Sequence, residues 1–283
     1  MLAKYIITCY YIISNMDYLQ TYSFHLEGES MKVGFDGGIK LEFHGAKLSS
    51  NGGLLAYRDL DHALGLFDSV SASFIDKRTG RNIQHAMPTL LRQSIYSRLA
   101  GYEDVNDAEQ LSVDTVMWAI TGKRDKGKQA ASTNTIGRFE TEILTQRDNL
   151  TCLSDINGMW VKKAMSKTSH KRIILDMDSS VSPVHGEQEG SAYNGHFSCT
   201  CFHPVFCFNQ FDDCEGVLLR SGNVYNSNRW KEVLEPIVKR YEHKNIRKYF
   251  RGDAAFAKPE IYNYLEENDF FICHPTTCKQ NTP

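Results

Sequence analysis

Two short apolar strands that each lead into aspartate constrain the fold of this chain more than any other feature. The first is the continuous apolar run 173–175 (Ile-Ile-Leu), typical of a central strand buried on both faces, and Asp176 and Asp178 follow it. The second runs over 246–250 and leads to Asp253. Because burying an unpaired carboxylate costs several kcal/mol, each acid needs an ion pair, a hydrogen-bonded turn or a metal ion.

The order of elements between residues 171 and 273 predicts the fold class. Three strands with hairpin-length joins are followed by a helix, a strand, a helix and a last strand, which predicts an α/β domain with a ribonuclease-H-like mixed sheet (β-β-β-α-β-α-β). In that fold a carboxylate on the first strand meets one at the end of the fourth, so Asp178 and Asp253 are expected to lie together. The expected strands are 171–180, 195–208, 215–224, 246–250 and 270–273, and the expected helices are 228–244 and a short one that opens at Pro259.

The region before this domain is predicted to be mainly helical. A hairpin is expected over 31–44, around Gly37-Gly38, and helices are expected over 53–65, 88–101, 114–120 and 132–144. We therefore predict three parts: residues 1–30 as a non-native or upstream extension with Met31 as the start, residues 31–150 as a β-hairpin plus helical DNA-binding region, and residues 171–283 as a truncated catalytic domain. The apolar run 2–14 is too short to span a bilayer.

Charge limits where nucleic acid can bind. A net charge of −2 over 283 residues gives no global attraction to phosphate, so any DNA-binding surface must be local. Basic residues gather in two helical segments on either side of an acidic loop, which suits phosphate contact, although a solvated helix face explains the same pattern. Arg251 is expected to neutralise Asp253 or to hold a phosphate. The candidate DNA-binding residues are Arg78, Arg81, Arg92, Lys123, Arg124, Arg138 and Arg251.

Asp178 and Asp253 are the candidate catalytic residues and metal ligands. Phosphodiester chemistry needs charge neutralisation on the scissile phosphate, and aspartates supply the hard oxygen ligands that Mg²⁺ prefers, with Mn²⁺ as an alternative. The competing interpretation is structural: Asp178 caps a turn, and Asp253 caps the helix at Pro259. The cysteines between 199 and 214 lack the paired C-x₂-C spacing of a structural zinc site, so zinc is not predicted.

Several motifs together resemble one protein family. They are Leu-Asp-Met-Asp-Ser-Ser from residue 175, His-Gly-Glu-Gln-Glu-Gly from 185, Ala-Tyr-Asn-Gly-His-Phe from 192 and Phe-Arg-Gly-Asp-Ala-Ala-Phe-Ala from 250. Upstream, Ser-Asn-Gly-Gly-Leu-Leu from residue 50 and Gly-Tyr-Glu-Asp-Val-Asn-Asp from 101 add to the match. The combination resembles the transposases of IS1380-type bacterial insertion sequences. The resemblance covers roughly residues 35–271.

That resemblance implies a DDE transposase that uses Mg²⁺ and acts in the bacterial cytoplasm, on the nucleoid. It implies DNA partners, namely the terminal inverted repeats and the target DNA, a homo-oligomer assembled on DNA, and no membrane. Asp178 matches the first catalytic acid of the family and Asp253 the second, with Asp176 as the fallback for the first.

One part of the family pattern is missing. The third acid, a glutamate on a helix after the fifth strand, has no counterpart, so we expect a C-terminally truncated copy with little or no activity alone. The rival hypothesis is a DNA-binding-only product that occupies terminal repeats. A ribonuclease-H-like nuclease unrelated to transposition is a third hypothesis, which the upstream match disfavours.

Overall fold

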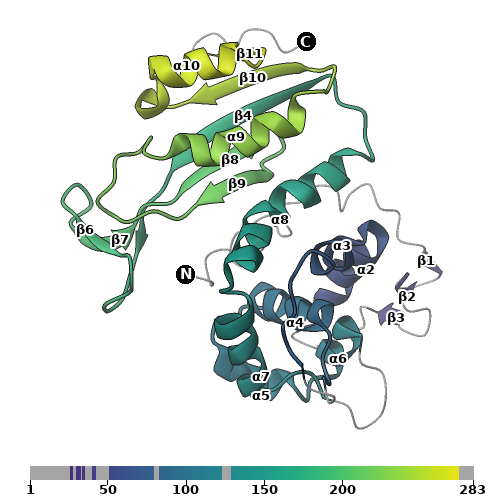
Figure 1. Ribbon diagram of the computed structural model, residues 1–283. Helices are drawn as coiled ribbons and strands as arrows, with labels where there is room; N and C mark the ends of the chain where they lie inside the picture. Colours follow the sequence, from purple (N-terminus) through teal and green to yellow (C-terminus); the bar gives the residue numbers. More distant parts are fainter. Residues whose placement is uncertain are drawn as a thin grey trace. The chain divides into compact units, whose positions relative to one another are not determined.

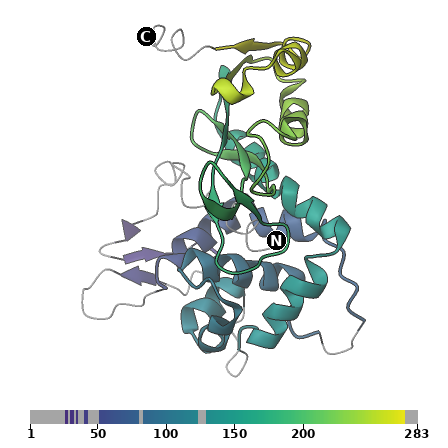
Figure 2. The same ribbon diagram turned by 90° about the vertical axis from the view of Figure 1, so that its left-hand side faces the viewer.

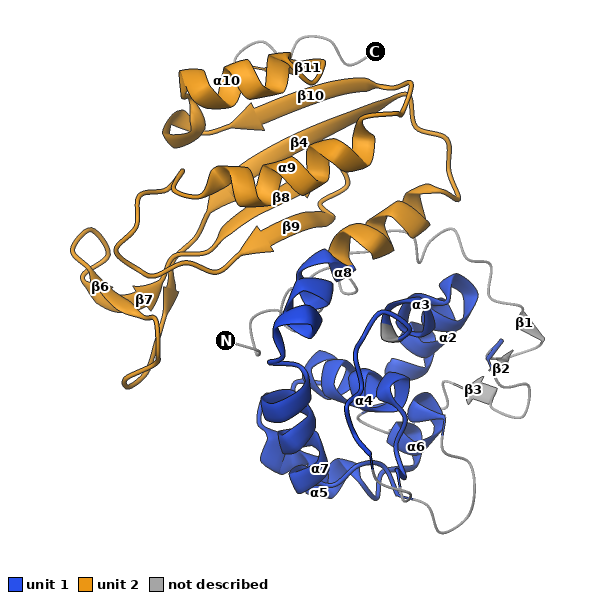
Figure 3. Ribbon diagram, in the orientation of Figure 1, with its two compact units in different colours: residues 1–156 blue, residues 157–283 orange. Residues whose placement is uncertain are grey.

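The computed structural model describes residues 26–27, 30–32, 34–35, 40–42, 51–79, 83–122 and 129–273. The chain divides into two compact units, residues 1–156 and residues 157–283 (Figure 3). Helix α8 (Arg147–Met165) contains the boundary between the two units. Each unit is described here by itself.

Unit 1 is built from short helices, seen from two sides in Figures 1 and 2. The helices expected over 53–65, 88–101 and 114–120 are confirmed. The first ends at Gly65, whose φ of 58° is left-handed, and the last begins after Asp114, which accepts a hydrogen bond from the Met117 N–H at 2.7 Å. The elements are α2 (Leu54–Leu64), α3 (Leu66–Ser71), α4 (Met87–Leu99), a 3₁₀ turn (Val105–Asp107), α5 (Ala108–Leu111), α6 (Thr115–Thr121) and α7 (Thr133–Arg138).

The expected hairpin is present as two strands, β2 (Ser30–Lys32) and β3 (Lys40–Glu42), which pair antiparallel. A third strand, β1 (Leu26–Glu27), pairs with β2 on its other side. The turn predicted at Gly37-Gly38 lies outside the described residues.

Two helical features differ from expectation. The helix expected over 132–144 changes to a π-helical turn at Phe139–Ile143. Helix α8, with 19 residues, covers a segment for which no helix was expected. The signal for it was present, because buried Leu153, Ile156, Trp160 and Ala164 recur at helical spacing.

Unit 2 contains the predicted mixed sheet. The strand order is β11-β10-β4-β8-β9, with β4, β10 and β11 parallel and β8 and β9 antiparallel (Figure 1). This order and the two helices between strands confirm the ribonuclease-H-like fold class. The bounds are β4 (Arg172–Ser179), β8 (Val205–Asn209), β9 (Cys214–Leu218), α9 (Trp230–Tyr241), β10 (Arg247–Gly252), α10 (Pro259–Glu266) and β11 (Phe270–Ile272).

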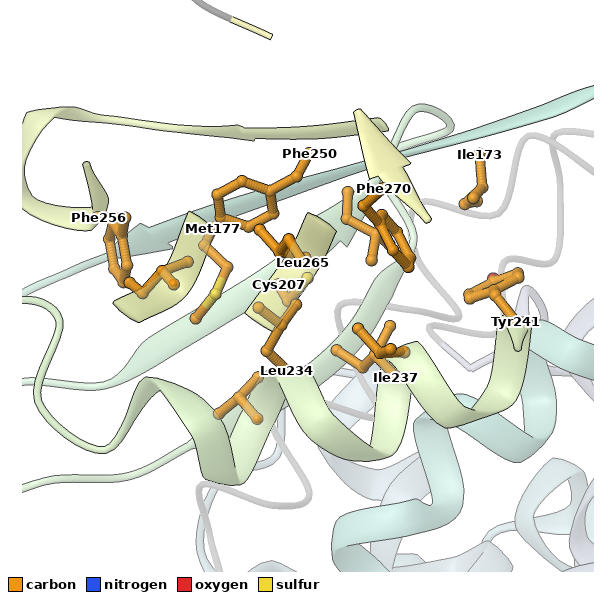
Figure 4. Packing of buried hydrophobic residues seen from close by; sticks show 14 of the residues in the cluster. Ile173, Met177, Cys207, Leu234, Ile237, Tyr241, Phe250, Phe256, Leu265 and Phe270 are labelled. Carbon is orange, nitrogen blue, oxygen red and sulfur yellow. The ribbon is translucent and has the colours of Figure 1, made fainter. Parts of the chain in front are cut away.

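One face of this sheet is packed and the other is open. Helices α9 and α10 and the end of α8 cover the face that carries Met177, Cys207 and Phe250, and Leu234 and Ile237 point into that core (Figure 4). On the opposite face Ile174, Phe206, Phe208 and Tyr249 are only half-buried, and Phe271 is exposed. The expectation that the first strand is buried on both faces is therefore wrong among the described residues.

The prediction of one strand over 195–208 is also wrong, because this segment forms two strands that belong to two different sheets. β7 (Cys199–Phe202) pairs with β5 (Ser182–Pro183) and β6 (Ala192–Asn194), whereas β8 pairs with β4. The break falls at His203-Pro204, since proline has no N–H for a ladder and the His203 N–H bonds to the Arg220 carbonyl at 3.0 Å. The third strand ends at Leu218, earlier than expected.

Gly222 is expected to tolerate no side chain. A Cβ built there lies 2.4 Å from the carbonyl oxygens of Ala192 and Cys201. Replacing Gly222 with alanine should therefore lower the free energy of unfolding by roughly 1–3 kcal/mol, the usual cost of overpacking, measured by denaturant titration. Gly195→Ala is the matched control, because a Cβ at Gly195 meets nothing within 4 Å. Equal stability of the two variants would contradict this prediction.

Candidate active site

Strand β4 places both of its aspartates on the open face of the sheet. Its burial alternates, with Ile173, Leu175 and Met177 buried on the packed face, so Asp176 and Asp178 lie on the other face. Asp178 is exposed near the carboxyl end of the strand. Its Oδ1 accepts a hydrogen bond from the N–H of Ser179 at 2.7 Å. Asp178 is therefore reachable from solvent, at the edge where β4 ends.

Asp176 is engaged by Arg251. The two residues are register partners on the parallel strands β4 and β10, and the Arg251 Nε donates to Asp176 Oδ2 at 2.7 Å. Their side chains are 33% and 49% exposed, so this ion pair contributes about 1 kcal/mol at most. The expectation that Arg251 neutralises Asp253 is wrong, because it pairs with Asp176; the alternative that it holds a phosphate stays a prediction. Parallel register, which the sequence spacing does not reveal, is the reason.

Asp253 follows β10 directly and is exposed. It precedes a 3₁₀ turn (Ala254–Phe256), and its Oδ1 accepts from the Ala255 N–H at 2.9 Å. It does not cap the helix at Pro259, since the residue before α10 is Lys258. The last register pair of β4 and β10 is Met177 with Gly252, and the next step along both strands leads to Asp178 and Asp253. Neighbouring strands are about 4.8 Å apart, so the sheet brings these two acids to one edge.

The chemistry of this edge suits a hard divalent cation. Each carboxylate uses Oδ1 for a local backbone bond, and within the described part of the chain Oδ2 of each has no hydrogen bond or ion pair. Carboxylate oxygens are the ligands that Mg²⁺ and Mn²⁺ prefer. Over the same described residues, no group of three or more His, Cys, Asp or Glu side chains is arranged to hold a metal. The edge of the sheet at the carboxyl ends of β4 and β10 therefore offers two carboxylates, those of Asp178 and Asp253, to a metal ion.

Glu215 is a buried carboxylate that sequence reasoning did not single out. Its Oε1 accepts from the Tyr241 hydroxyl at 2.5 Å and from the Asn209 amide at 3.0 Å, and its Oε2 forms an ion pair with Arg240. Burial, with the negative charge of Glu215, raises the pKa of Tyr241. These contacts tie β9 to α9 and to the end of β8. The sequence signal that could have identified Glu215 is its position as a charged residue in the strand expected over 215–224.

The basic residues predicted for DNA binding differ in their surroundings. Arg78 forms an ion pair with Asp76 at 2.6 Å, and its hydrogen bond lowers the pKa of that carboxyl. Arg138 is 74% exposed and reaches Glu142 at 3.3 Å. Both residues line a cavity of about 690 Å³ in unit 1. The remaining unit 1 candidates apart from Arg92, namely Arg81, Lys123 and Arg124, lie outside the described residues.

Arg92 holds the helices of unit 1 together. It is 6% exposed, and its guanidinium contacts Asp61 at 2.8 Å and Asp68 at 2.7 Å. Burial disfavours the charged guanidinium, but the two aspartates outweigh it and raise the pKa of Arg92. A buried cation with two carboxylate partners does not face solvent, so Arg92 is a structural residue and leaves the set of candidates for DNA contact.

A protein-family model described as "Transposase DDE domain group 1" matches residues 31–274. Comparisons with curated proteins and with solved structures give no significant match. Within the part of the chain that is described, no helix is both long and apolar enough to cross a membrane.

Proposed function

We propose that this chain, which belongs to the transposase DDE domain group 1 family, cuts and joins DNA at the ends of an insertion sequence of the IS1380 type. Members of this family catalyse phosphoryl transfer in DNA transposition. The observation that carries the proposal is that Asp178 and Asp253, far apart in sequence, end neighbouring strands of one sheet. The partners we propose are terminal inverted repeats and target DNA, bound by a homo-oligomer on the bacterial nucleoid.

Each part of the chain has a separate role in this proposal. Residues 31–150 contact DNA through local basic groups such as Arg78 and Arg138, and residues 171–283 supply the acids. Asp178 and Asp253 hold Mg²⁺ or Mn²⁺, which neutralises charge on the scissile phosphate when bound. The Arg251–Asp176 pair lies two register steps behind, where it keeps Asp176 neutralised and away from the metal. Rigid strands fix the spacing of the two acids better than loops would.

A DNA-binding-only protein is the second candidate function. The observation that favours it is that, among the described residues, only two acids meet at the edge and no third ligand is grouped with them. A protein of this kind occupies terminal repeats without cutting them.

The chain alone is expected to bind DNA but to cut it at most at trace level. The assay incubates the 283-residue protein with a DNA fragment that carries the regions flanking its gene, with Mg²⁺ or Mn²⁺, and follows binding and nicking on gels. Two carboxylates hold divalent cations less firmly than three, so the metal charge that neutralises the scissile phosphate is only partly in place, which is the reason for weak cleavage. Efficient cleavage that disappears in Asp178→Asn would establish the chain as a complete enzyme. Failure to bind any DNA would refute both candidate functions.

A further inference from the structure

The amino ends of β4 and β10 bring like charges together, at the opposite end of the strands from the two acids. Arg172 and Arg247 are register partners on these parallel strands, and Lys171 precedes β4. All three side chains are exposed. Like charges directly opposite each other on neighbouring strands destabilise a sheet. The fold therefore keeps an unfavourable arrangement at this point.

These three cations line one cavity of about 620 Å³, which we call the basic cavity. The aromatic rings of Phe211 and Tyr249 also line it. No aspartate or glutamate is among its lining residues, and within the described chain none of the three cations forms an ion pair. The basic cavity thus combines unpaired positive charge with aromatic surface.

His170 also lines the basic cavity, and its surroundings disfavour its charged form. Burial, helped by the positive charge of Lys244, lowers the pKa of His170. Its ring packs at 5.0 Å from that of Phe211, and its Nε2 lies 2.6 Å from the Thr168 hydroxyl. The charge of the basic cavity therefore comes mainly from Lys171, Arg172 and Arg247.

A neighbouring cavity of about 790 Å³ gives a useful contrast. It shares Lys171 and Arg247 with the basic cavity, but three acids line it as well: Glu242, Glu266 and Asp269. Lys244 and Lys248 line it too, so the three acids offset most of the positive charge of its cations. On the side of Arg172 no acid lines the cavity, so that side can attract an anion from outside.

We propose that the basic cavity binds the phosphodiester backbone of the DNA that the acidic edge acts on. This inference rests on the proposed function for the identity of the substrate. Arg172 and Asp178 are separated by six steps of about 3.3 Å on one strand, or roughly 20 Å. That length corresponds to about six nucleotides of duplex DNA, which rises about 3.4 Å per nucleotide along the helix axis. Guanidinium groups suit phosphate oxygens, and the aromatic rings suit sugar or base contact.

The test measures binding of a fluorescent 30-base-pair duplex between 50 and 200 mM salt for the whole chain and two double variants. Arg172→Gln/Arg247→Gln removes two charges from the basic cavity. Arg229→Gln/Lys239→Gln removes two charges from residues of unit 2 that form ion pairs with Glu232 and Glu235. Each lost phosphate contact lowers the salt slope by about 0.9, so the first variant should lose about two units of slope and at least tenfold in affinity, whereas the control keeps both.

Folding is checked by thermal unfolding without DNA. The Arg172→Gln/Arg247→Gln variant should unfold no earlier than the wild type, because it loses a repulsion between neighbouring strands. If it does unfold early, Lys171→Gln replaces it, with an expected slope change of about one.

The outcomes separate this inference from the proposed function. DNA binding with an unchanged slope in the basic-cavity variant, or equal losses in both variants, overturns the inference and leaves the proposed function intact. No DNA binding by the wild type overturns both together.

Discussion

Replacing Asp253 with asparagine is expected to weaken Mn²⁺ binding to this protein by roughly 100-fold, read from the paramagnetic signal of free Mn²⁺ during titration. Mutation of a residue that only hydrogen-bonds to a metal ligand costs about 10- to 100-fold in metal affinity. Removal of the charge of a ligand itself should therefore have an effect at the top of that range. Asp178→Asn is expected to have the same effect, because both acids come from the ends of the parallel strands β4 and β10.

Asp176→Asn is the matched control for this experiment. It lies on the same strand and face, but Arg251 already neutralises it at 2.7 Å. Mn²⁺ affinity should therefore change by less than about threefold, in line with the small energy of a half-exposed ion pair. A larger loss in Asp176→Asn than in Asp178→Asn would assign the metal to Asp176, the fallback in the sequence motif. Unchanged affinity in all three variants would remove the metal from this edge.

Glu215→Ala is expected to lower the free energy of unfolding by about 3–5 kcal/mol, because it leaves the Arg240 cation without its buried carboxylate. The Tyr241 hydroxyl and the Asn209 amide lose the same partner. Guanidinium titration followed by tryptophan fluorescence, to which Trp230 at the start of α9 contributes, reports on this unit. The physical cause is desolvation of the groups left behind. Glu215 is 1% exposed, so water cannot take the place of its carboxylate as their partner without a rearrangement of the surroundings.

Glu232→Ala provides the comparison for this variant. Glu232 forms an ion pair with Arg229 on the surface, and its side chain is 51% exposed. Its removal should change the free energy of unfolding by less than about 1 kcal/mol. If Glu215→Ala were no more destabilising than Glu232→Ala, the network that joins β9 to α9 would carry no measurable share of the stability.

Element types were predictable because their signals are local. Leu54 to Gly65 was identified from helical spacing and a closing glycine, and α9 from the apolar spacing of Val233, Leu234 and Ile237. The prediction of one strand over 195–208 failed because it did not take account of Pro204, which cannot donate to a ladder, and because a change of sheet leaves no local signal in the sequence. Helix α8 was missed because its buried residues are spread among many polar ones.

The sequence by itself determined the order of strands and helices in the mixed sheet and the two aspartates that follow apolar strands, since periodicity and residue type are properties of neighbouring residues. Only the tertiary structure decided the pairing of charges. The parallel register of β4 and β10 pairs Arg251 with Asp176 and places Arg172 beside Arg247. Helix packing in unit 1 encloses Arg92 between Asp61 and Asp68. An ion pair depends on the distance between side chains from separate elements, and that distance is fixed only when the sheet and helices assemble.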